Sequence, residues 1–137
     1  MAKTMGIILI FTDKGYDEFH QTLSFKAEKI KVYPFNKAPV AVKDCEVDII
    51  LLDCTDIDAG LQLLKENKTM CPNIPNIFLT DVNYEGVVLR AFRAGARDFF
   101  RKPVNVQELQ NTVEGLLKAR KESKEKRLPF IKTSLSP

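Results

Sequence analysis

The stretch VDIILLD, residues 47–53, determines the fold class. Its centre, Ile49 to Leu52, is apolar without alternation, which is typical of a strand that is covered on both faces of a sheet. A carboxylate at the end of such a strand contributes nothing to packing. We therefore expect a central strand of a parallel sheet here, and a functional role for Asp53.

Other apolar runs also end in polar residues. Ile7 to Phe11 is followed by Thr12 and Asp13, Ile77 to Leu79 by Thr80 and Asp81, and Phe99 to Arg101 by Lys102. If these runs are parallel strands, their polar ends lie along one edge of the sheet, and that edge is where open α/β sheets bind ligands. The sequence therefore predicts a functional site at the carboxyl ends of the strands.

The segments between these runs have the patterns of helices and of one edge strand. Tyr16, Phe19 and Leu23 recur at the spacing of one helical face, and lysines alternate with Ile30 and Val32 as in an edge strand. Further helices are predicted over about 40–45, from the loop with Asp56 and Asp58 to about Asn67, from a cap at Asn83 to Gly95 with Val87, Val88, Ala91 and Phe92 inward, and from Asn105 to about Lys121. The order βαβαβαβαβα, with right-handed crossovers, favours a doubly wound α/β sandwich of three layers.

The composition fits one folded domain of 137 residues, of which 45% are hydrophobic. The apolar stripe of the last helix stops near Lys121. We therefore expect a domain over residues 1–121 and a linker or disordered tail over 122–137, leading to an effector domain in a longer parent protein. No apolar run approaches the ~20 residues of a membrane span and no signal peptide pattern is present, so we expect a cytoplasmic protein.

The net charge of +3 does not indicate nucleic-acid binding by the domain itself. The segment from Lys118 to Arg127 carries more positive charge than the whole chain, so the remainder is slightly negative. Cys45, Cys54 and Cys71 are odd in number and too widely spaced for a zinc or redox motif, so reduced packing thiols are the better interpretation.

The residues at the predicted sheet edge suit phosphoryl chemistry. Two carboxylates, Asp13 and Asp53, provide the oxygen ligands that Mg²⁺ prefers. The cation of Lys102 and the hydroxyl of Thr80 are the groups that hold a phosphoryl group as charge spreads over its oxygens. Asp53 is then the nucleophile that forms an aspartyl phosphate. The chain has no G-x-x-x-x-G-K-[ST] or G-x-G-x-x-G motif, so the phosphoryl group must arrive on a donor other than a bound nucleotide.

With these residues in place, the sequence resembles the receiver domain of bacterial two-component response regulators over about Met5 to Arg120. The matching stretches are ILIFTD (8–13), DIILLD (48–53), IFLT (77–80) and GARDFFRKP (95–103), of which the last is the most specific. The resemblance implies a flavodoxin-like sheet of five parallel strands in the order 2-1-3-4-5, with helices on both faces.

The resemblance also implies the roles of the site residues and the partners. Asp53 would accept a phosphoryl group from the phosphohistidine of a sensor histidine kinase or phosphotransfer protein. Asp13, Asp53 and the main-chain carbonyl of Thr55 would hold Mg²⁺, Thr80 and Lys102 would bind the phosphate, and the Lys102–Pro103 bond would be cis. Such a domain catalyses only its own phosphorylation and dephosphorylation. Its output goes to an effector domain or protein, and the fourth helix, fifth strand and fifth helix commonly serve dimerisation.

Some positions depart from the family pattern. Thr12 stands where the family usually has an acid, which removes one negative charge near the cation. Asp56-Ile57 replaces the usual Met-Pro, and Gly60 comes one residue early. Asp81 stands where a small residue leaves room for the phosphoryl group, and Phe99 replaces the usual tyrosine or histidine of the switch.

These departures leave an alternative open, a degenerate receiver that acts as a protein-interaction scaffold without phosphorylation. Lys102 would then be a structural ion-pair partner of a buried Asp53. The single histidine, His20, is expected to be a surface or partly packed side chain without a catalytic role. A third interpretation is a flavodoxin-like protein that binds a small molecule, but the chain lacks the phosphate loop of such a protein.

Overall fold

The computed structural model describes residues 6–15, 20, 23, 27, 29–82 and 85–135, and only the backbone beyond residue 123. Its strands are β1 (Ile7–Thr12), β2 (Lys29–Pro34), β3 (Ile49–Cys54), β4 (Asn76–Thr80) and β5 (Asp98–Arg101). Its helices are the short η1 (Phe35–Lys37), α2 (Ala38–Ala41), α3 (Ile57–Met70), α4 (Val87–Arg93) and α5 (Val106–Leu135). Most of the predicted first helix lies outside the described residues, as does the predicted cap at Asn83.

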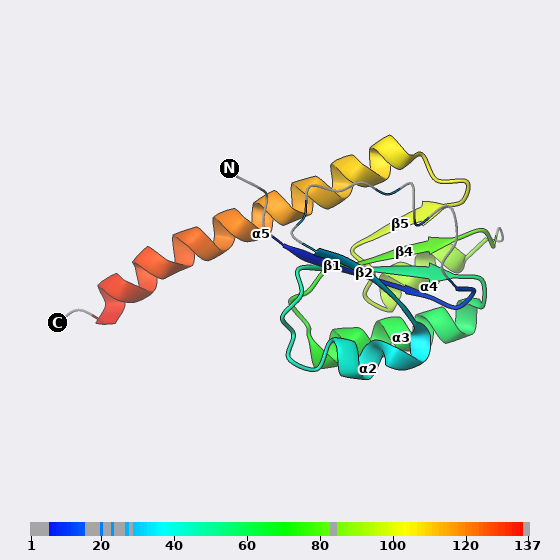
Figure 1. Ribbon diagram of the computed structural model, residues 1–137, viewed down its shortest axis with the longest axis horizontal. Coiled ribbons are helices and arrows are strands. Elements are labelled where there is room, and N and C mark those ends of the chain that lie inside the picture. Colours follow the sequence, from blue (N-terminus) through cyan, green and yellow to red (C-terminus); the bar gives the residue numbers. More distant parts are fainter. Residues whose placement is uncertain are drawn as a thin grey trace.

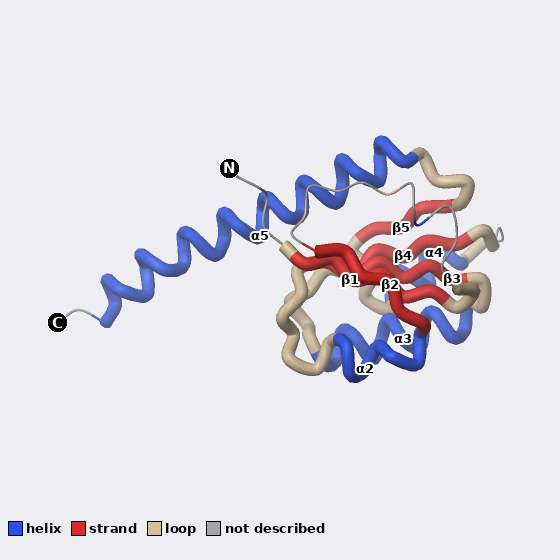
Figure 2. The backbone as a smooth tube through the Cα atoms, viewed as in Figure 1, coloured by secondary structure: helices blue, strands red, loops and turns tan. Residues whose placement is uncertain are grey.

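The strands form one parallel sheet in the order β2-β1-β3-β4-β5. Every residue of β3 is buried, as the uninterrupted apolar run predicts. Figure 1 shows α5 along one face of the sheet and α2 and α3 along the other, and Figure 2 shows the same layers by type of secondary structure. The predicted doubly wound, five-stranded sheet is confirmed.

Strand β3 sends its side chains into two cores. Ile50, Leu52 and Cys54 belong to the core shared with α3 and α4, whereas Ile49 and Leu51 belong to the core shared with α5. Successive side chains of a strand point to opposite faces, so an apolar run without alternation fills both cores. Burial of one Leu or Ile side chain contributes about 1.5–3 kcal/mol, so the position of β3, and of the carboxylate at its end, is strongly fixed.

Two helices differ from their predicted form. The helix predicted over about 40–45 is instead the pair η1 and α2, and Pro39 lies in the first turn of α2, where its missing N–H removes no helical hydrogen bond. In α4, Val87 and Ala91 are buried as predicted, but Val88 and Phe92 are 36% and 44% exposed. This helix of 7 residues contacts the core only through positions i and i+4, so its inner face is narrower than predicted.

Helix α5 continues to Leu135, beyond the predicted boundary near Lys121, and Figure 1 shows its C-terminal part projecting past the sheet. The buried residues Leu109, Val113 and Leu117 lie in its first half. The backbone is therefore helical over 122–135, within the predicted linker or disordered tail of residues 122–137. Lys, Arg and Glu are good helix formers even without an apolar stripe, whereas Pro129 in the same segment is not. Among the described residues, no helix combines the length and the apolar character needed to cross a membrane.

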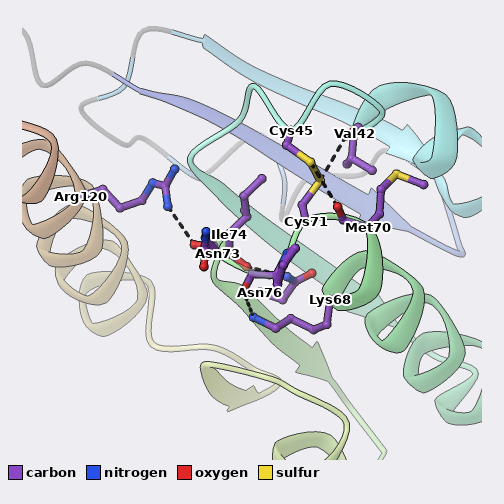
Figure 3. Close-up of a disulfide and its surroundings, with 10 residues drawn as sticks. Val42, Cys45, Lys68, Met70, Cys71, Asn73, Ile74, Asn76 and Arg120 are labelled. Carbon is purple, nitrogen blue, oxygen red and sulfur yellow. Dashed lines mark hydrogen bonds between the residues drawn. A yellow bond between two sulfur atoms is a disulfide. The ribbon is translucent and has the colours of Figure 1, made fainter. Parts of the chain in front are cut away.

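Cys45 and Cys71 form a disulfide that joins the loop before β3 to the end of α3 (Figure 3), with their Cα atoms 5.6 Å apart. The prediction of reduced thiols is wrong for this pair, and it is confirmed for Cys54, a buried free thiol. A spacing of 26 residues says nothing of distance in space, and the β3-α3-β4 crossover returns the chain to the edge where β3 begins. The disulfide therefore lies at the end of the sheet opposite Asp53.

Candidate functional site

Asp53, the residue before the end of β3, is the centre of the predicted site. Its side chain is 0% exposed, and its Oδ1 pairs with the ammonium of Lys102, which follows β5. Its Oδ2 lies 2.8 Å from Nε2 of His20, whose side chain is also 0% exposed. An ionised carboxylate only accepts hydrogen bonds, and Nε2 of His20 would be the donor to it. Two basic side chains from distant parts of the sequence therefore hold this buried carboxylate.

The contact with His20 was not predicted, because a surface or partly packed side chain was expected, whereas the side chain is fully buried against Asp53. A signal was nevertheless present in the sequence. His20 is four residues after Tyr16 and three before Leu23, and residues at these spacings share one face of a helix. A histidine on an apolar face that packs against the sheet is a candidate to contact the carboxylate at the sheet edge.

Thr12, at the end of β1, pairs in register with Asp53 and is buried. Its hydroxyl accepts a hydrogen bond from the N–H of Lys14 at 3.2 Å and lies 3.5 Å from Oδ2 of Asp53, at the limit for donation. A carboxylate at this position would place a second negative charge beside Asp53. The neutral hydroxyl of Thr12 adds no such charge.

Asp13 fastens the loop between β3 and α3. Its carboxylate accepts hydrogen bonds from the N–H of Thr55 at 2.9 Å, the hydroxyl of Thr55 at 3.0 Å and the N–H of Asp56 at 2.8 Å. Asp56 in turn caps α3 by accepting from the N–H of Ala59 at 3.1 Å. The loop with the unusual Asp56-Ile57 sequence is therefore ordered by Asp13, and α3 begins directly after it.

Thr80 and Lys102 lie at the ends of neighbouring strands, as predicted. The N–H of Lys102 donates to the carbonyl of Thr80 at 2.8 Å, which holds the end of β5 against β4. The hydroxyl of Thr80 accepts from the N–H of Val82 at 3.1 Å, and the register pairs Thr80 with Cys54, the residue after Asp53. The Lys102–Pro103 bond is cis, as the resemblance implies. The hydroxyl and the ammonium thus come from adjacent strand ends.

Two of the positions that depart from the family pattern have a clear place in the structure. Asp81 is exposed, so its carboxylate is not packed into the interior beside Asp53. Phe99 is half-buried and stacks on Phe78 with ring centroids 6.0 Å apart. The ring of Phe99 therefore packs against the core shared with α3 and α4.

Cys54, which follows Asp53, is a second buried ionisable group next to the site. Burial raises the pKa of its thiol, and the negative charges of Asp13 and Asp53 raise it further. A thiol with a raised pKa stays protonated at neutral pH, so Cys54 is a packing group and not a nucleophile.

The residues expected to hold Mg²⁺ have suitable oxygen atoms, but the described arrangement does not gather them around one point. The carboxylate of Asp13 faces the N–H groups of the next loop, and the oxygens of Asp53 face Lys102 and His20. Among the described residues, no three His, Cys, Asp or Glu side chains form a cluster that could hold a metal ion. The side chains as placed therefore do not fit a divalent cation.

A sequence model of the family described as "Response regulator receiver domain" matches residues 6–114. The chain belongs to this receiver domain family. A two-component response regulator of Arabidopsis thaliana, ARR9, is 31% identical over 103 residues, which cover 73% of this chain and 43% of that protein. The transcriptional regulatory protein ZraR of Salmonella typhimurium is 32% identical over 87 residues, which cover 62% of this chain and 20% of that protein. The receiver domain thus spans less than half the length of either relative.

Solved structures agree with the fold of the receiver domain. A CheY-like receiver domain protein from Methanospirillum hungatei superposes with a TM-score of 0.73 at 21% identity, covering 87% of this chain and 98% of the other. The signal receiver domain of a DNA-binding response regulator from Colwellia psychrerythraea has a TM-score of 0.67 at 26% identity, covering 82% of this chain and 98% of the other.

Proposed function

We propose that this receiver domain accepts a phosphoryl group on Asp53 from the phosphohistidine of a sensor histidine kinase or phosphotransfer protein. The observation that carries the proposal is the pairing of a fully buried Asp53 with Lys102 at the carboxyl edge of the sheet. A lysine in this position neutralises the charge that would otherwise repel an incoming phosphoryl group. The same pairing gives the carboxylate a partner in the protein interior, where an unpaired charge would be costly.

In the proposed reaction, one carboxylate oxygen of Asp53 attacks the phosphorus atom. The P–O bond to Asp53 forms as the P–N bond to the donor histidine breaks, and the leaving imidazole nitrogen takes up a proton. The ammonium of Lys102 stabilises the negative charge on the transferring group. The hydroxyl of Thr80 accepts the Val82 N–H through its oxygen, which leaves its proton able to donate to a phosphoryl oxygen. Hydrolysis of the aspartyl phosphate resets the domain.

Receiver domains generally use Mg²⁺, and the residues that would hold it here are Asp13, Asp53 and Thr55 through its main-chain carbonyl. When bound, the cation would neutralise charge between Asp53 and the phosphoryl group. We also propose that the domain acts in the cytoplasm. It would pass its signal to an effector domain or output protein, or to a second copy, through the face formed by α4, β5 and α5.

A second candidate function is a phosphorylation-independent scaffold. The observation in its favour is that His20 and Lys102 both occupy the carboxylate of Asp53 while Asp13 is engaged with the next loop. In this case the buried Asp53 would be a structural anchor between the β1–β2 segment, β3 and β5. The scaffold would bind its partners in a single state.

An amide NMR titration with Mg²⁺ and then beryllofluoride, a phosphoryl mimic, separates the two functions. We expect shifts around Asp53, Thr80 and Lys102 in the wild type and none in Asp53→Asn. The absence of any response in a well-folded wild type would contradict the phosphoacceptor function and favour the scaffold. Equal responses in the wild type and Asp53→Asn would place the binding elsewhere.

A further inference from the structure

The ring of His20 lies on the phosphoacceptor, and the site described above does not use it. Nε2 of His20 is 2.8 Å from Oδ2 of Asp53, a distance that leaves no room for another atom between them. Both side chains are 0% exposed. We propose that His20 is a gate on Asp53, and that the domain is loaded with cation or phosphoryl group only when the ring has left the carboxylate.

The two oxygens of Asp53 are held in different ways. Oδ1 pairs with Lys102, a contact that also serves the phosphorylated state because the ammonium would move onto the phosphoryl group. Oδ2 is covered by His20, with the hydroxyl of Thr12 at 3.5 Å. A group that joins Asp53 through Oδ2 must displace the imidazole, so His20 specifically opposes loading.

His20 and Lys102 reach Asp53 from different parts of the chain. His20 lies between β1 and β2, where its carbonyl accepts the N–H of Leu23 at 3.3 Å. Lys102 is instead fixed through its own backbone to Thr80 of β4. In the proposed gate, the ring of His20 leaves Oδ2 while Lys102 keeps its contact with Oδ1, so one side of Asp53 is uncovered.

The gate accounts for the surroundings of Asp53 in the described arrangement, where both carboxylate oxygens face basic side chains. In the closed state, in which His20 contacts Asp53, the buried carboxylate has two partners, His20 and Lys102, without a cation. These partners remove the cost of leaving the carboxylate unpaired. Binding must then compete with the contact between His20 and Asp53, and the apparent affinity falls by the fraction of molecules that are open. This inference rests on the proposed function.

The first test compares the affinity for Mg²⁺, and for beryllofluoride in its presence, among variants of His20 by amide NMR. His20→Ala removes the gate and should bind about tenfold tighter than the wild type, because a hydrogen bond to a charged group has this order of strength. His20→Gln keeps an N–H donor of similar reach and should bind like the wild type. Val113→Ala, a cavity in the buried face of α5, controls for general loosening of the fold and should also bind like the wild type.

Failure of the gate and failure of the proposed function give different results. Equal affinity of the wild type and His20→Ala would overturn the gate and leave Asp53 as a competent acceptor. No binding by the wild type and by a folded His20→Ala would overturn both. Tighter binding by Val113→Ala as well as His20→Ala would overturn the specific role of His20.

A second measurement uses the wild type alone, so it does not depend on the folding of a variant. His20 is the only histidine of the chain, and its ring gives a single set of imidazole ¹H–¹³C signals. As beryllofluoride saturates the site, these signals should shift from the position of a ring bonded to Asp53, and the Asp53→Asn spectrum supplies the reference for a ring without this carboxylate. Ring signals that stay unchanged at saturation would overturn the gate.

Discussion

Asp53 shows how one buried carboxylate can be accommodated in this fold. Its side chain is fully buried, and the partners Lys102, His20 and Thr12 come from three separate parts of the chain. Each partner lowers the cost of burying the carboxylate. The same partners also limit which groups can contact the carboxylate. The contacts that stabilise buried Asp53 therefore also control access to it.

Removal of Lys102 should therefore destabilise the domain as well as abolish phosphorylation. We expect Lys102→Met to lower the free energy of unfolding by about 3 kcal/mol, the lower end of the range for breaking a buried pair, because His20 remains on Asp53. Urea denaturation monitored by circular dichroism measures this. Asp53→Asn in the Lys102→Met background should recover most of the loss, and strictly additive effects of the two substitutions would contradict a direct pair.

Cys54 should be inert towards alkylation in the folded protein. Burial raises the pKa of its thiol, and Asp13 and Asp53 add to this, so almost no thiolate is present at pH 8. Under non-reducing conditions we expect no carbamidomethyl group on Cys54 until urea unfolds the chain, as measured by peptide mass spectrometry. Labelling of native protein at the rate of a free cysteine would contradict the burial of this thiol.

At the scale of elements, α3 and β3 approach closely through Gly60. A Cβ atom added at Gly60 would lie 2.4 Å from Sγ of Cys54, and other atoms of Cys54 and Phe78 are also near. Gly60→Ala should therefore lower the free energy of unfolding by about 1–3 kcal/mol, although alanine favours a helix more than glycine does.

Gly115 of α5 offers a matched control for this clash, because a Cβ atom there would meet nothing within 4 Å. Gly115→Ala should raise the stability by up to about 1 kcal/mol. Cys54→Ala should relieve much of the penalty of Gly60→Ala in the double variant. Equal effects at Gly60 and Gly115 would show that the approach of α3 to β3 is looser than described.

The disulfide between Cys45 and Cys71 ties two connections at the edge of the sheet away from Asp53. Its closed loop, with a separation of 26 residues, should contribute about 3 kcal/mol by restricting the unfolded chain. Thermal unfolding with and without reductant measures this contribution. Cys45→Ser/Cys71→Ser should match the reduced protein and be indifferent to reductant, and an unchanged melting temperature of the wild type on reduction would contradict the crosslink.

For the whole molecule, the sequence predicts the sheet because most of its strands are continuous apolar runs. The run before Asp53 needs cover on both faces, and short connections with right-handed crossovers leave few arrangements of such strands. Asp53, Thr80 and Lys102 were predicted for the same reason, since each lies at or directly after the carboxyl end of a strand. The pattern of apolar residues therefore predicts the strands and the residues at their ends.

Three features were not predicted: the disulfide, the contact of His20 with Asp53 and the length of α5. The disulfide joins residues far apart in sequence, and His20 reaches Asp53 from a segment that the strand pattern does not describe. The predicted end of α5 depended on the loss of its apolar stripe, whereas the helical backbone continues without one. These features follow from the assembled fold and from local propensity, not from apolar periodicity.

The most direct test of the account is whether Asp53 takes up a phosphoryl group. The intact mass of the protein would be measured after incubation with Mg²⁺ and a small-molecule donor such as acetyl phosphate, for the wild type, His20→Ala and Asp53→Asn. We expect a gain of one phosphoryl group on Asp53 in the wild type, a faster gain in His20→Ala, and none in Asp53→Asn. No gain in folded wild type and His20→Ala, or an equal gain in Asp53→Asn, would contradict it.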